Sequence, residues 1–210
     1  MLAAANLTAA AVSAGSSLAG TTISALTANV DVNVACGFEI SNWTKYVMEK
    51  PMAYPKGGRI KIPPVEIFPG VKEAMVTHKT PLSVMGSYGT ASWLIQDRRV
   101  VVMWDAPFNF DFNSNWLGVG ITKKGKTSHI GDFYDIMYTG KQINYMHPNA
   151  DFRFNRKIFR DDVNSVSLED GEFEIEGTMG TTHLTSVYIV VKALDKKDYA
   201  PSVRKAMDIE

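Results

Sequence analysis

The chain has 210 residues, of which 45% are hydrophobic, and its 22 Lys and Arg balance its 22 Asp and Glu. This length favours one sizeable core over two full domains, and the balanced charge excludes a long-range pull toward nucleic acid or an anionic bilayer. Cys36 is the single cysteine, which excludes an intramolecular disulfide framework and a site built from several thiolates.

The first 30 residues, MLAAANLTAAAVSAGSSLAGTTISALTANV, contain no Lys, Arg, Asp or Glu. A secretory signal peptide is one interpretation, although a charged n-region and a Leu-rich centre are missing. At 100° per residue the segment is also a weakly amphipathic helix, about 45 Å long if fully helical. Its two arcs consist of Leu7, Val12, Leu18, Ile23, Leu26 and Val30 on the apolar side, and Asn6, Ser13, Ser16, Ser17, Thr21, Ser24 and Thr27 on the polar side.

From residue 31 onward, short alternating or β-branched runs separated by Gly, Pro and Asn predict strands and turns. They predict a mostly β fold: an antiparallel β-sandwich flanked by short α-helices. A short helix is expected in IGDFYDIMYTG, with Gly140 as its C-terminal cap. The predicted organisation is an N-terminal segment 1–30, a sandwich 31–194 and a tail 195–210. The predicted strand runs are VDVNVACGFEI, GRIKIPPVEIF, RVVVMW, WLGVGIT and the closing pair EFEIEGTM and SVYIVVK.

The residues that usually carry catalysis are scattered. The sequence has no HExxH, GxSxG, P-loop or strand-linked GxGxxG motif, so neither an enzyme, a metal site nor a cofactor is predicted. In EFEIE, alternation places the glutamates on one solvated strand face. The basic turn KKGK is typical of a hairpin loop, so no nucleic-acid partner is predicted. The histidines, which are far apart, are His78, His129, His147 and His183.

The stretch PFNFDFNSNW links two predicted strands and carries four aromatic rings in ten residues. Pro107 cannot donate a ladder hydrogen bond, so the preceding strand should end near it. If the stretch continued as a strand, Phe108, Phe110 and Phe112 would all point to one face and into the core. If it is a loop, some rings are exposed beside polar side chains, which suits a bilayer interface. The pattern leaves both interpretations open.

PFNFDFNSNWLGVGI resembles the proline, aromatic and SNW signature of the actinoporins, the pore-forming cytolysins of sea anemones and their relatives in other animals. GDFYDIMYTG resembles the aromatic short helix of that family, in the same order, and the likeness is strongest over residues 84–140. NVACGFEISNWT, AYPKGGRIKIPP, FEIEGTMG and SVYIVVK fit more loosely. The resemblance implies a secreted protein that binds the phosphocholine headgroup of sphingomyelin or phosphatidylcholine on a target cell membrane. It also implies self-association and insertion of the N-terminal helix as the wall of an oligomeric pore.

The resemblance assigns roles to individual residues. Asn113 replaces a headgroup tyrosine of the family, and Asp105 replaces a serine, so the expected aromatic cage is thinned. Phosphocholine affinity and sphingomyelin preference therefore stay open, as does a lipid- or carbohydrate-binding module that never perforates. The expected headgroup residues are Asp105, Pro107, Asn113, Tyr134 and Tyr138, the interface residues Phe110, Phe112 and Trp116, and the pore-lining residues Asn6, Ser13, Ser17 and Ser24.

Overall fold

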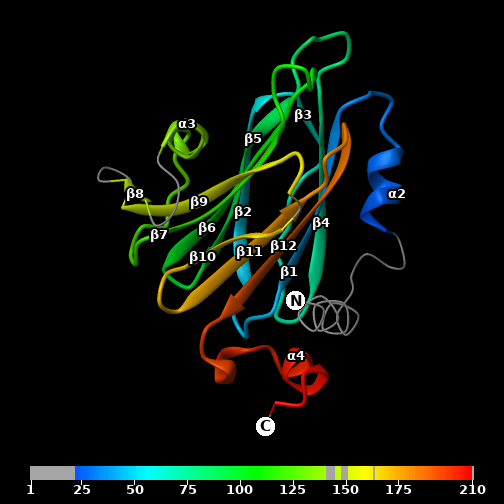
Figure 1. The fold of residues 1–210 in the computed structure, drawn as a ribbon. Coiled ribbons are helices and arrows are strands. Elements are labelled where there is room, and N and C mark those ends of the chain that lie inside the picture. The colour runs from blue at the N-terminus through cyan, green and yellow to red at the C-terminus, as the bar shows by residue number, and fades with distance from the viewer. Residues whose placement is uncertain (1–21, 141–144, 148–150, 163, 210) are drawn as a thin grey trace.

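The structure, a computed structural model, describes residues 22–140, 145–147, 151–162 and 164–209. Two six-stranded sheets pack face to face (Figure 1), which confirms the predicted β-sandwich. The first has the order β10-β11-β12-β1-β4-β3, and the second has the order β2-β5-β6-β7-β9-β8. All described strand pairs are antiparallel except β1 and β12, which run parallel.

Seven of the twelve described strands have eight to ten residues, so they are longer than the short strands that the turn-rich sequence predicts. The first sheet contains β1 (Ala35–Asn42), β3 (Arg59–Ile62), β4 (Lys72–His78), β10 (Val166–Glu169), β11 (Phe173–Met179) and β12 (Leu184–Ala193). The second contains β2 (Met48–Gly57), β5 (Ser87–Ile95), β6 (Arg98–Ala106), β7 (Asn115–Thr122), β8 (Tyr145–His147) and β9 (Phe152–Phe159).

Strand alternation builds the core between the sheets. On β11, Phe173, Ile175 and Met179 are buried, while Glu174 and Glu176 point outward and pair with Lys192. The predicted closing pair of strands is thus confirmed by the β11–β12 ladder. Large rings fill the centre, where Phe38 and Trp104 meet edge to face with centroids 5.4 Å apart.

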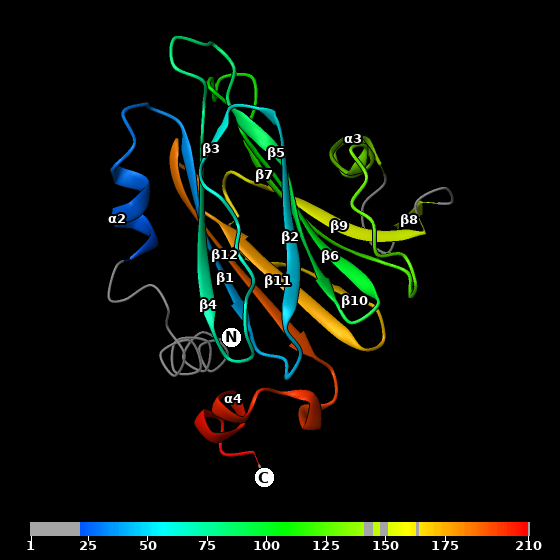
Figure 2. The same cartoon turned by 180° about the vertical axis from the view of Figure 1, so that it is seen from behind.

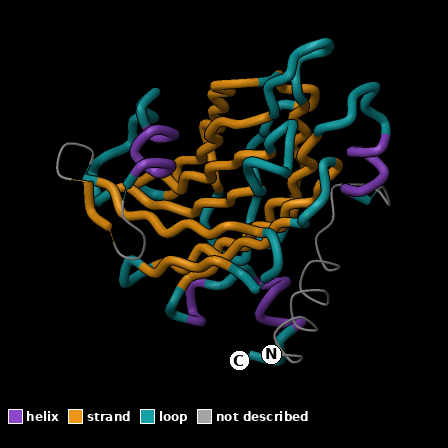
Figure 3. The backbone as a smooth tube through the Cα atoms, turned by 45° about the horizontal axis from the view of Figure 1, so that its top comes forward, coloured by secondary structure: helices purple, strands orange, loops and turns teal. Residues whose placement is uncertain are grey.

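The helices lie outside the sheets, at the periphery of the strands (Figure 3). Helix α2 (Ile23–Ala28) covers the first sheet and α3 (Phe133–Thr139) covers the second, on opposite sides of the sandwich (Figure 2). The helix expected near residue 133 is therefore confirmed, with Gly140 as its C-cap. The tail forms η1 (Lys196–Asp198) and α4 (Pro201–Ala206), whose Val203 is buried with Trp43.

Helix α2 is the described part of the predicted N-terminal amphipathic helix. Ile23 and Thr27 face the sheet, and Ser24 faces solvent. The placement of Thr27 on the polar side was wrong. A Cβ at Gly37 of β1 would lie 1.9 Å from Thr27 Oγ1. Thr27 can pack against β1 only because this glycine has no side chain. The Thr27 hydroxyl is satisfied by donating to the Ile23 carbonyl at 2.8 Å.

Several elements of the structure differ from those that the sequence predicts, or were not predicted. Residues 31–34 alternate but form no strand, and bends at 31–33 lead from α2 into β1. Strand β5 is buried almost throughout, so no polar face marks it. Strand β2 is interrupted by register shifts, and Lys50 there has a positive φ of 48°. Strands β8, β9 and β10 occupy the region from 141 to 171, to which no element was assigned.

Candidate functional site

Three of the five predicted headgroup residues, Asp105, Tyr134 and Tyr138, converge on the outer face of the second sheet, under α3. Tyr88 of β5 is opposite Asp105 of β6, which is opposite Trp116 of β7. Residues opposite each other in neighbouring strands share a face of the sheet. The three side chains therefore form one row across β5, β6 and β7, at the end of the strands next to residues 107–114.

Helix α3 lays two tyrosines over this row. Tyr134 and Tyr138 are one turn apart, and their rings stack with centroids 5.4 Å apart and an interplanar angle of 11°. Tyr134 also meets Tyr88 at 5.4 Å, and Tyr138 meets Trp116 at 5.8 Å. We call Tyr88, Trp116, Tyr134 and Tyr138 the aromatic cluster. The sequence patterns had not singled out Tyr88, because β5 shows no alternation.

Asp105 lies beneath the cluster. The Tyr134 hydroxyl donates a hydrogen bond of 2.8 Å to its carboxylate. Burial raises the pKa of Asp105 to about 6, and the hydrogen bond from Tyr134 opposes this rise. Burial, together with the neighbouring carboxylate, raises the pKa of Tyr134. Asp105 thus holds α3 against the sheet.

Two cations of the chain itself face the rings. Lys56 Nζ lies 5.5 Å from the centroid of Tyr134 and forms an ion pair with Asp135. The Arg156 guanidinium lies 4.5 Å from the centroid of Trp116 and 5.9 Å from that of Tyr138. Both distances are in the range of cation–π contacts. The aromatic cluster therefore already carries positive charge on its ring faces.

His129 fixes the segment that leads into α3. Its Nδ1 lies 2.7 Å from Ser92 Oγ, and its ring stacks on Tyr54 at 4.4 Å. Arg99 donates to the same Ser92 oxygen at 2.7 Å. Burial, with a contribution from the charge of Arg99, lowers the pKa of His129 to about 4. The imidazole is therefore neutral at physiological pH.

The stretch 107–114 is a loop, and β6 ends at Ala106 as predicted. Its rings do not all point into the core: Phe108 packs on the core, Phe110 stacks on His183 at 4.0 Å, and Phe112 is 83% exposed. Pro107 is buried, and Asn113 is exposed with its N–H donating to Asn109. The loop interpretation is therefore the correct one.

A second loop, residues 79–86, lies beside 107–114 at the top of Figure 1. A Cβ at Gly86 would lie 2.8 Å from the Pro107 Cα, which shows how closely the two loops approach. Leu82, Val84 and Met85 of this loop are exposed, as is Phe112 of its neighbour. We call this the apolar end of the sandwich, formed by residues 79–86, 107–114 and 180–183. The run TPLSVMG could have suggested an exposed apolar loop, because Pro, Ser and Gly punctuate its apolar residues.

The linker between α2 and β1, residues 29–34, reaches the sandwich at the same end. The Lys79 N–H donates to the Val34 carbonyl at 3.0 Å, and the Ala35 N–H donates to the His183 carbonyl at 2.9 Å. Ser24 Oγ, an expected pore-lining group, lies 3.3 Å from Ser186 Oγ. Asn6, Ser13 and Ser17 lie outside the described residues.

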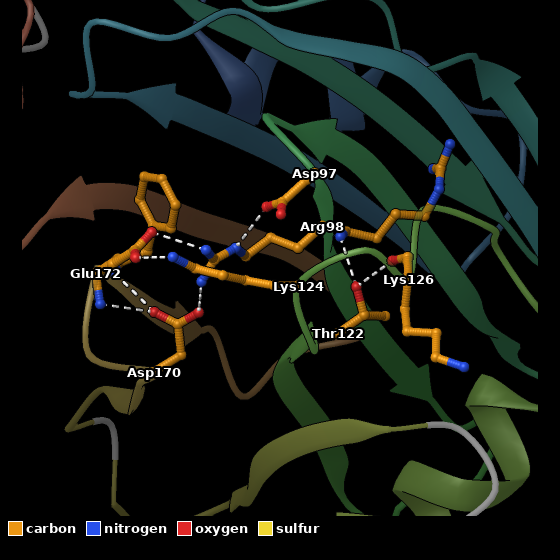
Figure 4. A network of polar contacts seen from close by, with 9 residues as sticks. Asp97, Arg98, Thr122, Lys124, Lys126, Asp170 and Glu172 are labelled. Atoms are coloured by element: carbon orange, nitrogen blue, oxygen red, sulfur yellow. Dashed lines mark hydrogen bonds and ion pairs between the residues drawn. The ribbon is translucent and has the colours of Figure 1, made fainter.

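The opposite end of β6 and β7 is charged. Arg98, 3% exposed in its side chain, donates to Asp170 at 2.5 Å and to Glu172 at 2.7 Å (Figure 4). Lys124 also pairs with Glu172. We call this the ionic end, formed by turn residues 96–97, 123–126 and 170–172. These pairs border a hollow of about 440 Å³, lined by Arg98, Ile121, Thr122, Lys123, Lys124, Asp151, Arg153, Asp170, Gly171 and Glu172. Arg98 is satisfied by neighbouring carboxylates, which suits a structural role.

Within residues 22–140, 145–147, 151–162 and 164–209, no group of His, Cys, Asp and Glu is arranged to hold a metal ion. None of the helices in this part of the chain is long and apolar enough to cross a membrane.

The chain is similar to several curated proteins over most of its length. The chain is 37% identical to Tereporin-Ca1 of Terebra anilis over 194 residues, 88% of this chain and 97% of that protein. It is 32% identical to Conoporin-Cn1 of Conus consors over 200 residues, 93% of this chain and 78% of that protein. The solved structure of the lipid binding protein Nakanori matches 80% of this chain and 75% of its own with a TM-score of 0.57, and its 16% identity limits the likeness to the fold. No family model matches.

The chain thus has the β-sandwich fold, and the curated proteins that it matches over most of their length are named as porins. The chain belongs to the actinoporin-like family of pore-forming toxins. The resemblance in the proline, SNW and aromatic-helix motifs is thereby confirmed at the level of the family.

Proposed function

We propose that the protein binds choline-headgroup lipids, sphingomyelin or phosphatidylcholine, with the aromatic cluster and the apolar end. On the membrane of a target cell the secreted protein then self-associates and inserts residues 1–28 as the wall of an ion-permeable pore. The observation that carries this proposal is spatial: the exposed apolar side chains and the linker to the N-terminal segment lie at one end of the sandwich.

Docking by the apolar end follows from its side chains. Leu82, Val84, Met85 and Phe112 are exposed on two adjacent loops. Burying apolar area in the lipid interface stabilises a complex by about 25 cal/mol per Å². Phe112 fits the proposed role of an interfacial aromatic. Phe110 and Trp116, the other proposed interfacial rings, are half-buried against His183 and Arg156.

The aromatic cluster would then meet the headgroups. Trp116 lies two residues beyond the loop 107–114, so the cluster sits beside the end that touches the bilayer. Aromatic faces attract quaternary ammonium groups by about 0.5 to 2 kcal/mol. Pro107 would support the loop from its buried position, and exposed Asn113 would offer an amide to the headgroup where the family has a ring.

Insertion of the N-terminal segment is favoured by the position of the linker. With the apolar end on the membrane, residues 29–34 lie at the bilayer surface, and α2 can leave the sheet without moving β1. A helix of residues 1–28 would be about 42 Å long, longer than the roughly 30 Å hydrocarbon core. The segment has no charged side chain to bring into lipid.

Dye release and vesicle binding test the proposal together, on phosphatidylcholine vesicles with and without sphingomyelin. The intact chain should bind and release dye, and a chain lacking residues 1–28 should bind without release. A chain shortened by the last residues, 207–210, serves as the control and should still release dye. Binding without release by the intact chain would instead identify a non-perforating module, and release by the chain lacking residues 1–28 would exclude this segment as the pore wall.

A pore lined by Asn6, Ser13, Ser17 and Ser24 would discriminate weakly between cations and anions, because these side chains carry no fixed charge. Reversal potentials in single-channel recordings under a salt gradient measure this directly. A strong cation preference would place acidic residues of the sandwich in the conducting path.

A further inference from the structure

The Arg156 side chain occupies the part of the aromatic cluster that a headgroup cation would need. Arg156 lies opposite Gly118 of β7, which presents no side chain, and its guanidinium reaches the rings of Trp116 and Tyr138. At 4.5 Å from the centroid of Trp116, this cation is as close to the ring as a bound ligand cation would be.

The second cation reinforces this arrangement. Lys56 stands over Tyr134, and the nearby carboxylates are already engaged: Asp105 accepts from Tyr134, and Asp135 pairs with Lys56. A quaternary ammonium entering the cluster would therefore meet the guanidinium of Arg156 and the ammonium of Lys56. Like charges at such short range repel, and partial burial strengthens the repulsion.

The same side chains suit an anion. Arg156 is half-buried, and it donates to the carbonyl oxygens of Tyr138 and Gly140 at the end of α3. Its Nε is buried and has no hydrogen-bond partner among the described residues. A guanidinium fork binds the oxygens of a phosphate with geometry that few other side chains match. Lys56 is exposed and adds a mobile ammonium at the rim.

We propose that Arg156, with Lys56, makes the aromatic cluster select headgroups by their phosphate group and not by their quaternary ammonium. This inference rests on the proposed function in that the cluster is the headgroup site, and it assigns recognition of the choline headgroup to its phosphate in place of the attraction between the rings and its ammonium. Phosphocholine then binds through its phosphate, and headgroups that carry phosphate without choline bind equally well. The same chemistry is present in a lipid headgroup and in a small soluble phosphate ester.

Competition on vesicles separates the two recognition modes. The full-length protein is bound to phosphatidylcholine vesicles, and phosphocholine, phosphoethanolamine, glycerol 3-phosphate or choline is added at equal ionic strength. The three phosphate esters should displace the protein at similar concentrations, and choline should require at least tenfold more. Displacement by choline and phosphocholine, but not by glycerol 3-phosphate, would overturn the inference and leave the proposed function intact. A protein that binds none of the vesicles would fail the proposed function itself.

Variants assign the effect to the two cations. Arg156→Gln should weaken competition by glycerol 3-phosphate at least tenfold and strengthen competition by choline. Arg160→Gln removes the same charge from an exposed position near the end of β9 and should change neither. Lys56→Gln is a second test, with Lys50→Gln as its control, because both lysines are exposed on β2. This test remains valid if Arg156→Gln fails to fold.

Lys56→Gln should weaken competition by glycerol 3-phosphate about threefold, with Lys50→Gln unchanged. Equal effects of both lysine variants would reduce the role of Lys56 to general charge. Unchanged competition in Arg156→Gln and Lys56→Gln would exclude both as phosphate ligands. Vesicles containing phosphatidic acid in place of part of the phosphatidylcholine distinguish a membrane phosphate from a soluble one. They should bind the wild-type protein more tightly than they bind Arg156→Gln.

Discussion

At the ionic end of the sandwich, turns from both sheets are joined by Arg98, Asp170 and Glu172, whereas at the apolar end Leu82 and Phe112 project into solvent from neighbouring loops. The strands between the two ends are the same strands, so the core does not cause the difference. The loop sequences cause the difference. The loops of the ionic end pair their charges within the chain, and the loops of the apolar end leave apolar side chains exposed. The ionic end is thus held by ion pairs within the chain, and the apolar end is the surface that we propose contacts the membrane.

The largest effect is expected from breaking the ionic end. Arg98→Ala leaves Asp170, which is nearly buried, and Glu172 without their main partner, and removal of one member of a buried ion pair costs roughly 3 kcal/mol. Urea unfolding measures this loss. Arg160→Ala, which removes an exposed arginine, should cost less than about 1 kcal/mol. Equal losses in both variants would show that the ionic end does not stabilise the fold.

Next in size is the change at the apolar end. Replacing Leu82, Val84, Met85 and Phe112 together by Ser should weaken binding to phosphatidylcholine vesicles about 30-fold, which corresponds to roughly 2 kcal/mol of lost apolar burial. Flotation of the protein with vesicles gives the affinity. Val65→Ser with Phe68→Ser removes exposed apolar side chains from the β3–β4 loop and should leave binding unchanged. A comparable loss in this control would make membrane contact a property of the whole surface.

A smaller effect is expected where the N-terminal segment joins the apolar end. Gly37→Ala places a methyl group within 1.9 Å of Thr27 Oγ1 and 2.9 Å of an Ile23 side-chain carbon, so α2 should leave the sheet more often. Proteolytic cleavage within residues 22–34 should become about tenfold faster, a change of roughly 1.4 kcal/mol. Gly131→Ala meets open space and serves as the control. An unchanged cleavage rate would mean that α2 adjusts without undocking.

The smallest effect is a pH dependence beside the aromatic cluster. The pKa of Asp105 rises from 3.8 to about 6 on folding. Between these pH values the folded chain binds this proton more tightly than the unfolded chain does. The contribution of Asp105 to the free energy of unfolding therefore decreases as pH rises from about 4 to 6. The pKa of His129 falls from 6.5 to about 4, so His129 raises stability over nearly the same window. The two contributions oppose each other between about pH 4 and 6.

Asp105→Asn should uncover the His129 contribution. Stability of this variant should rise by about 1 kcal/mol from pH 4.5 to 5.5, while that of the wild type changes less. Urea midpoints at several pH values measure the slope, and Asp111→Asn, in the exposed loop, should behave as the wild type. A variant slope equal to that of the wild type would contradict the assigned pKa of Asp105.

The sequence patterns predict the parts of this molecule that have one clear periodicity. The alternation of β11, the end of β6 before Pro107 and the helix around Phe133 all follow from local signals. The parallel pairing of β1 with β12 does not, because it joins residues about 150 positions apart through tertiary contacts alone.

For the candidate site, the family motifs supplied Tyr134, Tyr138 and Trp116, which the structure brings together. They did not supply Arg156, because its contact with these rings depends on the placement of β9 beside β7. They also missed Leu82, Val84 and Met85, although the Pro, Ser and Gly residues of TPLSVMG mark that run as a loop. Thr27 was misplaced because the space that accepts it belongs to Gly37, a residue of another element.

Strand β1 begins directly after the linker and is held on both sides, by β12 over its whole length and by β4 over most of it. A force drawing residues 1–28 into a bilayer would pull β1 along its own axis, out from between these neighbours. Both ladders would then be loaded in shear, with many hydrogen bonds resisting together, whereas the few contacts of α2 yield one after another. In the proposed insertion, the ladders on both sides of β1 would therefore keep the sandwich intact while α2 leaves the sheet.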